Sequence, residues 1–375
     1  MKNNMNSKKW IKILAVLCVL GVGFVGGINY LVDPQGFNNT VIIDRINSKK
    51  YSNTSMTTRF KAKILEKGNF DAIMLGTSRI GVMNPNIVNK YLNTNTFNLE
   101  YPGSNTIIQN KLFKYANHFN DIKYLIYGID FLAFNENRII KNDFKEFYDL
   151  EENIENFETI SNFELYFNFE TFTKSVKLVI KNILNKQKDE AIYLASNGMR
   201  DYRNYIQEYN NGKLDLTKNI NSSIKSYFKT DGTYKNYKFS YKYLEYFKDT
   251  LDYCKKNDIK VFVYIPPMYS QHFDAINKAG YFDEFELFKK ELVKLTNYID
   301  FTGHNSITEN KNNYWDSSHL RVEVTKQIME KLFNDKTVDT TNNFGTLVTK
   351  ENINHHLENL RTQIKDYDLK KIVNK

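Results

Sequence analysis

Two short motifs, far apart in the chain, contain the residue types of a serine-dependent acyl-transfer site. Residues 75–79 (LGTSR) end a strongly apolar run, and residues 315–319 (WDSSH) precede the last helix-like segment of the main domain. A serine hydroxyl at its free pKa is a poor nucleophile, so it needs a base within hydrogen-bond reach and a carboxylate that orients this base. Ser78, His319 and Asp316 supply these groups, and the two motifs therefore predict a Ser-His-Asp hydrolase triad.

Such a triad requires a fold that brings early and late residues together, and the chain has the pattern of one. Strand-like runs alternate with helix-like segments: the runs are 70–75, 96–99, 124–129, 261–265 and 298–301, and the segments are 104–119, 241–254, 282–295 and 322–333. This alternation predicts an α/β fold with a parallel sheet. Reactive groups gather at the carboxyl ends of such strands, and Ser78 directly follows the first strand. Alone, a serine at this place also fits a helix N-cap.

Other parts of the chain depart from this alternation. Residues 136–240 are rich in charge and aromatic side chains, and we interpret them as a mainly helical insertion with a segment at 172–184. This insertion either caps the site or pads the edge of the sheet. Residues 33–67 are predicted to form a spacer and a first helix, and residues 336–375 a linker and a C-terminal helix.

An uncharged apolar segment of twenty residues at 13–32 follows a basic tail at 1–12. At about 1.5 Å per residue, a helix of this length spans the ~30 Å hydrocarbon core of a bilayer. The preceding lysines orient the N-terminus toward the cytoplasm by the positive-inside rule. We therefore predict a single-pass anchor in the cell membrane, with the main domain extracellular. A cleaved signal peptide is the rival interpretation, and the length of the stretch and the lack of a clear small-x-small site disfavour it.

Composition and charge narrow the possible partners. The formal net charge is +9, of which Lys2, Lys8, Lys9 and Lys12 contribute +4. The remaining mildly basic chain suits an anionic wall polymer or lipid surface. No nucleic-acid motif, P-loop or Gly-x-Gly-x-x-Gly is present, so we predict neither nucleic-acid nor nucleotide binding. The two cysteines imply no disulfide framework, and histidines without neighbouring carboxylates or cysteines at ligand spacing lead us to predict no metal and no cofactor.

The two motifs resemble those of the SGNH/GDSL hydrolase superfamily, over residues 68–335. Gly76-Thr77-Ser78 together with Asp316-x-x-His319 carry the resemblance. It implies a flavodoxin-like three-layer α/β/α sandwich. It also makes Ser78 the nucleophile, His319 the general base and Asp316 the residue that orients the base. His304, which follows a predicted strand, is an alternative base.

The family's oxyanion hole adds a glycine after the second strand and an asparagine after the third. Gly103 matches the glycine and would act together with Ser78, but the asparagine position is occupied by Asp130. An ionised carboxylate would repel a developing oxyanion instead of donating a hydrogen bond to it. Either Asp130 is protonated, or Asn105 is the donor, or the site is weaker than in typical members. The chain also has Thr77 where the family has an aspartate.

The anchor and the Gly-Thr-Ser-Arg variant are similar to those of cell-envelope members of the superfamily. These include alginate and peptidoglycan O-acetylation proteins and the D-alanyl lipoteichoic acid transfer protein, which often work beside a membrane-bound O-acyltransferase. The resemblance implies an O-acyltransferase or esterase acting on a cell-surface polysaccharide or teichoic-type polymer. The alternative is a non-catalytic polymer-binding or assembly partner of a membrane-bound O-acyltransferase. Arg79 and Trp315 are candidate substrate contacts, with a salt bridge and core packing as their respective alternatives.

Overall fold

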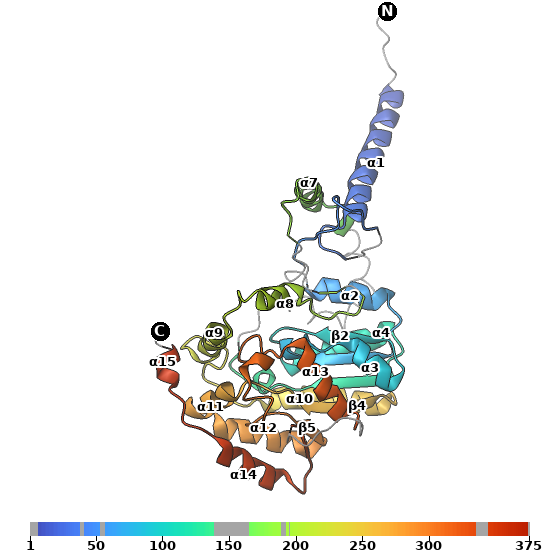
Figure 1. Cartoon of the computed structure of the whole chain (residues 1–375). Helices are drawn as coiled ribbons and strands as arrows, with labels where there is room; N and C mark the ends of the chain where they lie inside the picture. Colours follow the sequence, from blue (N-terminus) through green and yellow to red (C-terminus); the bar gives the residue numbers. More distant parts are fainter. Residues whose placement is uncertain are drawn as a thin grey trace, which may run out of the picture. The chain divides into compact units, whose positions relative to one another are not determined.

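The structure is a computed structural model of the whole chain and describes residues 7–37, 41–52, 57–138, 165–188, 193–194, 196–334 and 344–373 (Figure 1). The chain divides into two compact units. Unit 1 comprises Met1–Ile64 and Glu152–Ser196, and unit 2 comprises Leu65–Glu151 and Asn197–Lys375. All candidate site residues named above lie in unit 2.

Unit 2 is built on a six-stranded sheet with the strand order β2-β1-β3-β4-β5-β6. The strands are β1 (Ala72–Gly76), β2 (Thr96–Glu100), β3 (Tyr124–Gly128), β4 (Lys260–Ile265), β5 (Tyr298–Asp300) and β6 (Thr346–Val348). The first five are parallel, and β6 pairs antiparallel with β5. The order of the parallel strands is that of a flavodoxin-like sheet. The predicted α/β fold with a mainly parallel sheet is thus confirmed.

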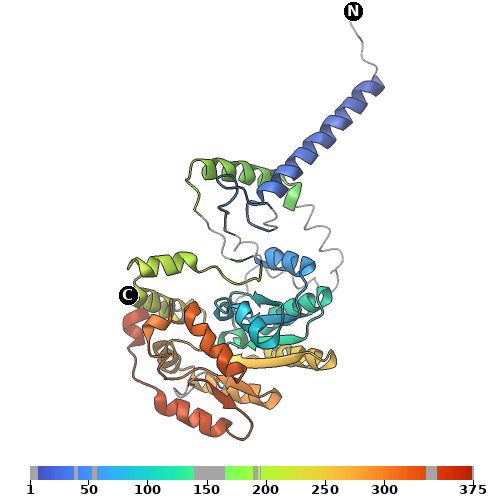
Figure 2. The same cartoon turned by 45° about the vertical axis from the view of Figure 1, so that its right-hand side comes forward.

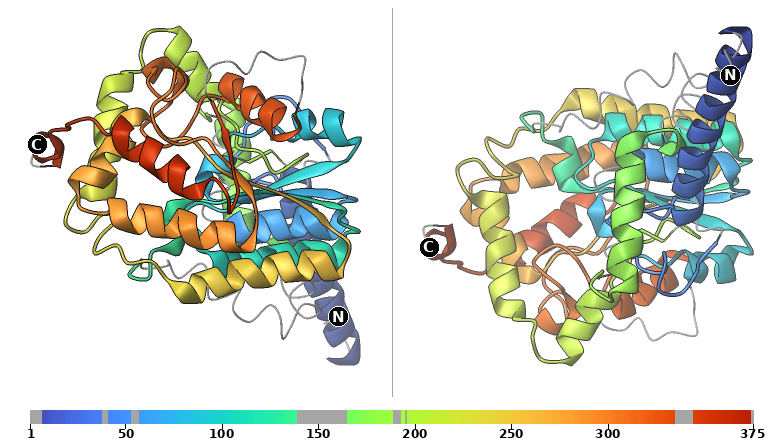
Figure 3. Two further views of the ribbon diagram at one scale, coloured as in Figure 1. Left: turned by 90° about the horizontal axis from the view of Figure 1, so that it is seen from below. Right: turned by 90° about the horizontal axis from the view of Figure 1, so that it is seen from above.

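Helices cover both faces of this sheet, as Figure 3 shows. On one face lie α4 (Thr106–Phe119), α10 (Tyr241–Lys256) and α12 (Phe282–Leu295), and on the other lie α3 (Pro85–Leu92) and α13 (Val322–Leu332). Because both faces are covered, every residue of β1 is buried. This explains why the first strand reads as a continuous apolar run and not as an alternating one.

The exit from β1 depends on a glycine. Gly76 pairs with Glu100 on β2 and with Gly128 on β3, and its φ of +152° is disfavoured for residues with a side chain. A Cβ atom at this position would collide with the backbone oxygen of Gly128 and with the side chain of Ile80. The glycine therefore lets the chain turn sharply between two neighbouring strands. The turn leads into a short 3-10 helix, Ser78–Ile80, at the carboxyl end of the sheet.

The C-terminal part differs from the prediction in two places. Residues 346 and 347 of the predicted linker belong to β6, whereas residues 335–343 lie outside the described residues. The C-terminal helix is split into α14 (Ile353–Gln363) and α15 (Leu369–Val373). The helix ends because the backbone N–H of Lys365 donates to Asp274 Oδ1 (3.0 Å) instead of to a carbonyl one turn earlier.

A buried charged cluster joins α12, β5 and α14. Lys289 and His356 both donate to Oδ2 of Asp300, the latter over 2.7 Å, and Lys289 also donates to Thr302 Oγ1 (2.9 Å). The side chains of Lys289 and Asp300 have no exposed surface. Burial alone would raise the pKa of the Asp300 carboxyl, but Lys289 and His356 outweigh this effect and hold it below its usual range. The cluster thus contains an ionised carboxylate in the protein interior.

The predicted helical insertion is present, and its two ends belong to different units. Helix α7 (Phe169–Ile183) is part of unit 1, whereas α8 (Arg203–Asn210) and α9 (Leu216–Phe228) are part of unit 2. Within unit 2, α9 packs against α11 (Ser270–Lys278) and α15. Residues 139–164 of the insertion lie outside the described residues.

Unit 1 contains a long N-terminal helix, α1 (Ser7–Val32), and α7 packs against it. Helix α1 is long and apolar enough to cross a membrane or to act as a signal sequence. The first helix predicted within residues 33–67 corresponds to α2 (Thr57–Lys67), and residues 53–56 lie outside the described residues.

Candidate active site

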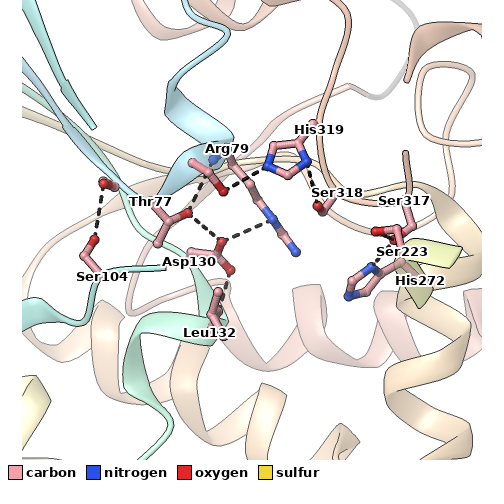
Figure 4. Close-up of polar contacts among 12 residues, drawn as sticks. Thr77, Arg79, Ser104, Asp130, Leu132, Ser223, His272, Ser317, Ser318 and His319 are labelled. Atoms are coloured by element: carbon pink, nitrogen blue, oxygen red, sulfur yellow. Dashed lines mark hydrogen bonds and ion pairs between the residues drawn. The ribbon is translucent and has the colours of Figure 1, made fainter. Parts of the chain in front are cut away.

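Three side chains, two of which come from late in the sequence and one from early in unit 2, form a continuous hydrogen-bonded chain, whose central residue, His319, is labelled in Figure 4. Ser78 Oγ lies 2.9 Å from His319 Nε2, and His319 Nδ1 lies 2.7 Å from Asp316 Oδ2. Ser78 follows β1, and Asp316 and His319 lie in the loop before α13. Both ring nitrogens of the histidine are therefore engaged, one by the carboxylate and one by the hydroxyl. The hydroxyl and the imidazole have the relation that removal of the serine proton requires.

The carboxylate of Asp316 also organises the loop that carries His319. Its Oδ1 accepts hydrogen bonds from the backbone N–H groups of Ser318 (2.7 Å) and His319 (3.0 Å). Its other oxygen remains available for the imidazole. Desolvation would raise the pKa of Asp316, but His319 and the two N–H groups outweigh it and lower the pKa below its usual range. The ionised carboxylate thus orients the histidine ring in two ways. It accepts a hydrogen bond from Nδ1 of the ring, and it holds the backbone of the loop that carries His319.

Asp130 forms a second polar cluster beside Ser78. Its Oδ2 accepts a hydrogen bond from Thr77 Oγ1 (2.9 Å) and pairs with Arg79 Nε at 3.1 Å, and its Oδ1 accepts from the Leu132 N–H (3.2 Å). Burial would lower the pKa of Arg79, yet the attraction of Asp130 outweighs it and raises the pKa. The three partners of Asp130 are all donors, which is the environment of a carboxylate that accepts hydrogen bonds. Thr77, on the first motif, is thereby held beside Asp130.

The loop after β2 brings further donors to the same edge of the sheet. The backbone N–H of Tyr101 donates to the Gly76 carbonyl (2.9 Å), so this loop lies against the exit from β1. Gly103 has a φ of +70°, and a Cβ there would overlap the guanidinium of Arg138. Asn105 caps α4 by accepting from the Ile108 N–H (3.2 Å), and its Nδ2 is buried with no hydrogen-bond partner in the described structure. An unsatisfied buried donor of this kind is costly unless a ligand uses it.

The surroundings of Trp315 and His304 do not suit the roles considered for them, which were substrate contact and general base, respectively. The indole of Trp315 is 2% exposed and stacks on Tyr202 at a centroid distance of 6.2 Å, with the guanidinium of Arg321 5.1 Å from its ring. A sugar ring would have to displace these neighbours. His304 lies 3.0 Å from Asp274 and 2.9 Å from Glu309, and it forms no described contact with Ser78.

A second serine-histidine pair, which no sequence pattern indicated, lies near the first. His272 Nδ1 lies 2.8 Å from Ser317 Oγ, which is also 2.8 Å from Ser223 Oγ on α9 (Figure 4). His272 is fully buried, and desolvation together with the nearby Arg79 lowers its pKa well below the ordinary value. The ring is therefore neutral at physiological pH, and it connects α11, α9 and the loop before α13. No motif spacing signals this cluster, because His272, Ser317 and Ser223 lie on three separate elements.

The hydroxyls of Tyr227 and Tyr234 complete the surroundings of Arg79. Both side chains are buried, and burial is the main cause of their raised pKa values. Tyr234 also lies 3.4 Å from His272 Nε2. These two residues come from the second half of the insertion, which thus contributes part of the wall around the site.

Comparison of this chain with protein-family models and with curated protein sequences finds no match. The resemblance to SGNH hydrolases therefore depends on the motif residues and their arrangement.

Proposed function

We propose that this protein is a serine-dependent O-acyltransferase or esterase of SGNH type that acts on a cell-surface polysaccharide or teichoic-type polymer. The observation that carries the proposal is the hydrogen-bonded chain from Asp316 through His319 to Ser78. This order of groups, with a partly buried carboxylate at one end and a half-buried serine at the other, is the one that activates a serine hydroxyl for attack on an ester.

The proposed reaction proceeds through an acyl-enzyme. Ser78 Oγ attacks the carbonyl carbon of an ester while His319 Nε2 takes the hydroxyl proton. The tetrahedral intermediate then collapses, the ester C–O bond breaks, and His319 returns the proton to the departing alkoxide oxygen. A sugar hydroxyl or a water molecule attacks the acyl-serine in the same way and regenerates Ser78, which gives transfer or hydrolysis respectively.

The oxyanion of each intermediate requires hydrogen-bond donors. Of the alternatives considered for the side-chain donor, the contacts of Asp130 favour Asn105 over a protonated Asp130. Its carboxylate already accepts hydrogen bonds from Thr77 and the Leu132 N–H and forms an ion pair with Arg79, which favours its role as an acceptor. Asn105, in contrast, has a buried Nδ2 without a partner among the described residues. We therefore assign the side-chain donor role to Asn105, beside the backbone N–H groups of Ser78 and Gly103.

Positive charge near the site supports an anionic substrate polymer. Arg79 is 3% exposed, Arg138 lies against Gly103, and Asp130 contributes to the electrostatic surroundings of both. One carboxylate thus pairs with Arg79 and also attracts Arg138 from a distance, and Nη1 of Arg138 has no hydrogen-bond partner in the described part of the chain. An excess of buried positive charge is favourable when a substrate anion compensates it.

The proposal is tested with the full chain in detergent, incubated with p-nitrophenyl acetate and examined by intact mass. We expect an acetyl adduct on Ser78 and labelling of the same residue by a fluorophosphonate. His319→Ala should abolish both modifications, whereas His304→Ala should retain them. Neither adduct nor label in the folded wild-type protein would contradict the proposal and favour a polymer-binding partner of a membrane-bound O-acyltransferase.

The assignment of Asn105 predicts a defect in chemistry and not in substrate binding. Asn105→Ala should lower kcat by ~10²–10³-fold with a small change in KM, since removal of one oxyanion donor has an effect of this size. Asn105→Asp keeps an acceptor for the Ile108 N–H and so preserves the helix cap, but it lacks the donor. A kcat of Asn105→Asp close to that of the wild type would refute the assignment.

A further inference from the structure

Helix α7 has a covered face that is unusually polar. Ser175, Leu178 and Asn182 are its buried residues. Ser175 Oγ donates to Asn29 Oδ1 on α1 (3.0 Å), and Asn182 exchanges hydrogen bonds with the backbone of Lys49 (3.0 and 3.1 Å). Unit 1 thus holds this helix through hydrogen bonds at Ser175 and Asn182 as well as through the buried Leu178.

The opposite face of α7 is apolar and exposed. Phe169, Val176, Ile180 and Ile183 are 73%, 40%, 51% and 59% exposed, respectively. Their spacing of seven, four and three residues places them on one side of a helix. A helix in water buries its apolar side and exposes its polar side, and α7 does the reverse. These four side chains form an apolar stripe whose exposure to water is unfavourable, so the stripe is expected to contact an apolar surface or a membrane.

Lysines flank the apolar stripe. Lys174, Lys177 and Lys181 follow one another at intervals of three and four residues, and Lys186 and Lys188 come just after the helix. Lys174 pairs with Glu170, the one acidic residue of α7. A helix with an apolar stripe bordered by lysines is typical of peripheral membrane binding, because the stripe enters the acyl chains and the ammonium groups meet anionic headgroups.

The position of α7 on α1 agrees with such an interface. All described residues of helix α1 up to Phe24 are exposed, and from Val25 on buried and exposed positions alternate. A span of ~30 Å needs about 20 residues, which starting at Ile13 ends at Val32. The ring pairs Phe24–Phe172 (6.2 Å) and Tyr30–Tyr166 (5.5 Å) place α7 at the outer end of that span. Aromatic side chains concentrate at this depth of a membrane, and α7 runs crosswise to α1 (Figure 2).

The same contacts favour a retained α1. Asn29 is 1% exposed, and its Nδ2 donates to the carbonyls of Tyr166 (2.7 Å) and Asn168 (3.1 Å). The ring of Phe167 lies against Gly26. Asn168 is in turn the N-cap of α7, where its side chain accepts from the Glu170 and Thr171 N–H groups. Removal of α1 as a signal peptide would leave these groups without partners, so the end of α1 is part of the folded unit.

We propose that α1 is a retained transmembrane anchor and that α7 is an interfacial helix of the same membrane. The apolar stripe of α7 lies among the acyl chains of the outer leaflet, and its lysines contact anionic headgroups. This inference is independent of the catalytic proposal, because it concerns only contacts within unit 1.

The test uses the full chain in nanodiscs of phosphatidylethanolamine and phosphatidylglycerol. In a Cys18→Ser background, in which only the buried Cys254 remains, Ile180→Cys and Ile183→Cys are labelled with an environment-sensitive fluorophore. Lys177→Cys is the matched control on the same helix. We expect blue-shifted emission at 180 and 183 and several-fold stronger quenching by acyl-chain nitroxide lipids than at 177. Equal emission and quenching at all three positions would overturn the proposal.

Two further readouts separate the alternatives. Shielding of 180 and 183 in native membranes but not in pure-lipid nanodiscs would assign the stripe to a protein partner and overturn the lipid interface. Intact mass of the protein extracted from native membranes should include α1. Recovery of a chain that begins after Val32 would overturn the retained anchor.

Discussion

Replacing Ser78 with alanine is expected to lower ester turnover by at least ~10⁴-fold while leaving the fold intact. Loss of the serine removes the acyl-enzyme route, and only binding and oxyanion stabilisation then remain. Ser78 is half-buried and its hydroxyl contacts His319, so the truncation removes one hydrogen bond and little packing. The change is measured as kcat with p-nitrophenyl acetate, and the melting temperature is the control for folding.

The double variant Ser78→Ala/His319→Ala sharpens this prediction. If the two side chains act as one unit, the double variant should be about as inactive as either single one. Multiplicative losses would instead mean that the two residues contribute independently. Ser317→Ala is a matched control, because this serine contacts the other histidine, His272. It should retain most of the activity if Ser78 is the nucleophile.

Replacing Asp300 with leucine is expected to destabilise unit 2 by ~3–5 kcal/mol, because it leaves a buried ammonium group without its carboxylate. Lys289 would keep Thr302 Oγ1 as its only remaining hydrogen-bond partner of those described above. At this size of domain, such a loss lowers the melting temperature by roughly 6–20 °C. Differential scanning fluorimetry of the full chain in detergent measures the shift.

The double variant Lys289→Met/Asp300→Leu distinguishes an uncompensated charge from a loss of packing. Replacement of both members of a buried ion pair by apolar residues of similar volume is often nearly neutral. We therefore expect the double variant to regain most of the lost stability. A double variant as unstable as Asp300→Leu alone would contradict this explanation and attribute the loss to the contacts of Asp300 with His356 and Thr302.

The mainly parallel sheet was predictable from sequence because apolar runs such as β1 alternate with amphipathic helical segments, whereas the strand order was implied only by the resemblance to a known fold. Full burial of β1 leaves a continuous apolar run, and the amphipathic helices between the strands have a clear period. The contact of Ser78 with His319 follows from the same pattern, since strand order and the shared carboxyl edge bring the two loops together. Sequence patterns are thus sufficient to predict an element where its burial in the folded protein matches the spacing of its apolar residues.

The features that escaped prediction depend on contacts without a local signal. The strand β6 has three residues and is specified by its pairing with β5. The break after Gln363 arises because Asp274, about 90 residues earlier, accepts the Lys365 N–H. Asp130 was recognised as a departure from the family, but its pairing with Arg79 and Thr77 depends on the packing of the loops after β1 and β3. The conformation at each of these places is determined by residues that are distant in sequence.

The separation of Ser78 from His319 by 241 residues has a consequence for biosynthesis. A ribosome that adds about 5–20 residues per second makes the histidine roughly 10–50 s after the serine. During this interval the hydroxyl has no base and keeps the low reactivity of free serine. The nascent chain would therefore be inert toward esters until the loop before α13 has been made and has docked on the sheet. Activation would thus be a late event of folding that needs no separate inhibitor or propeptide.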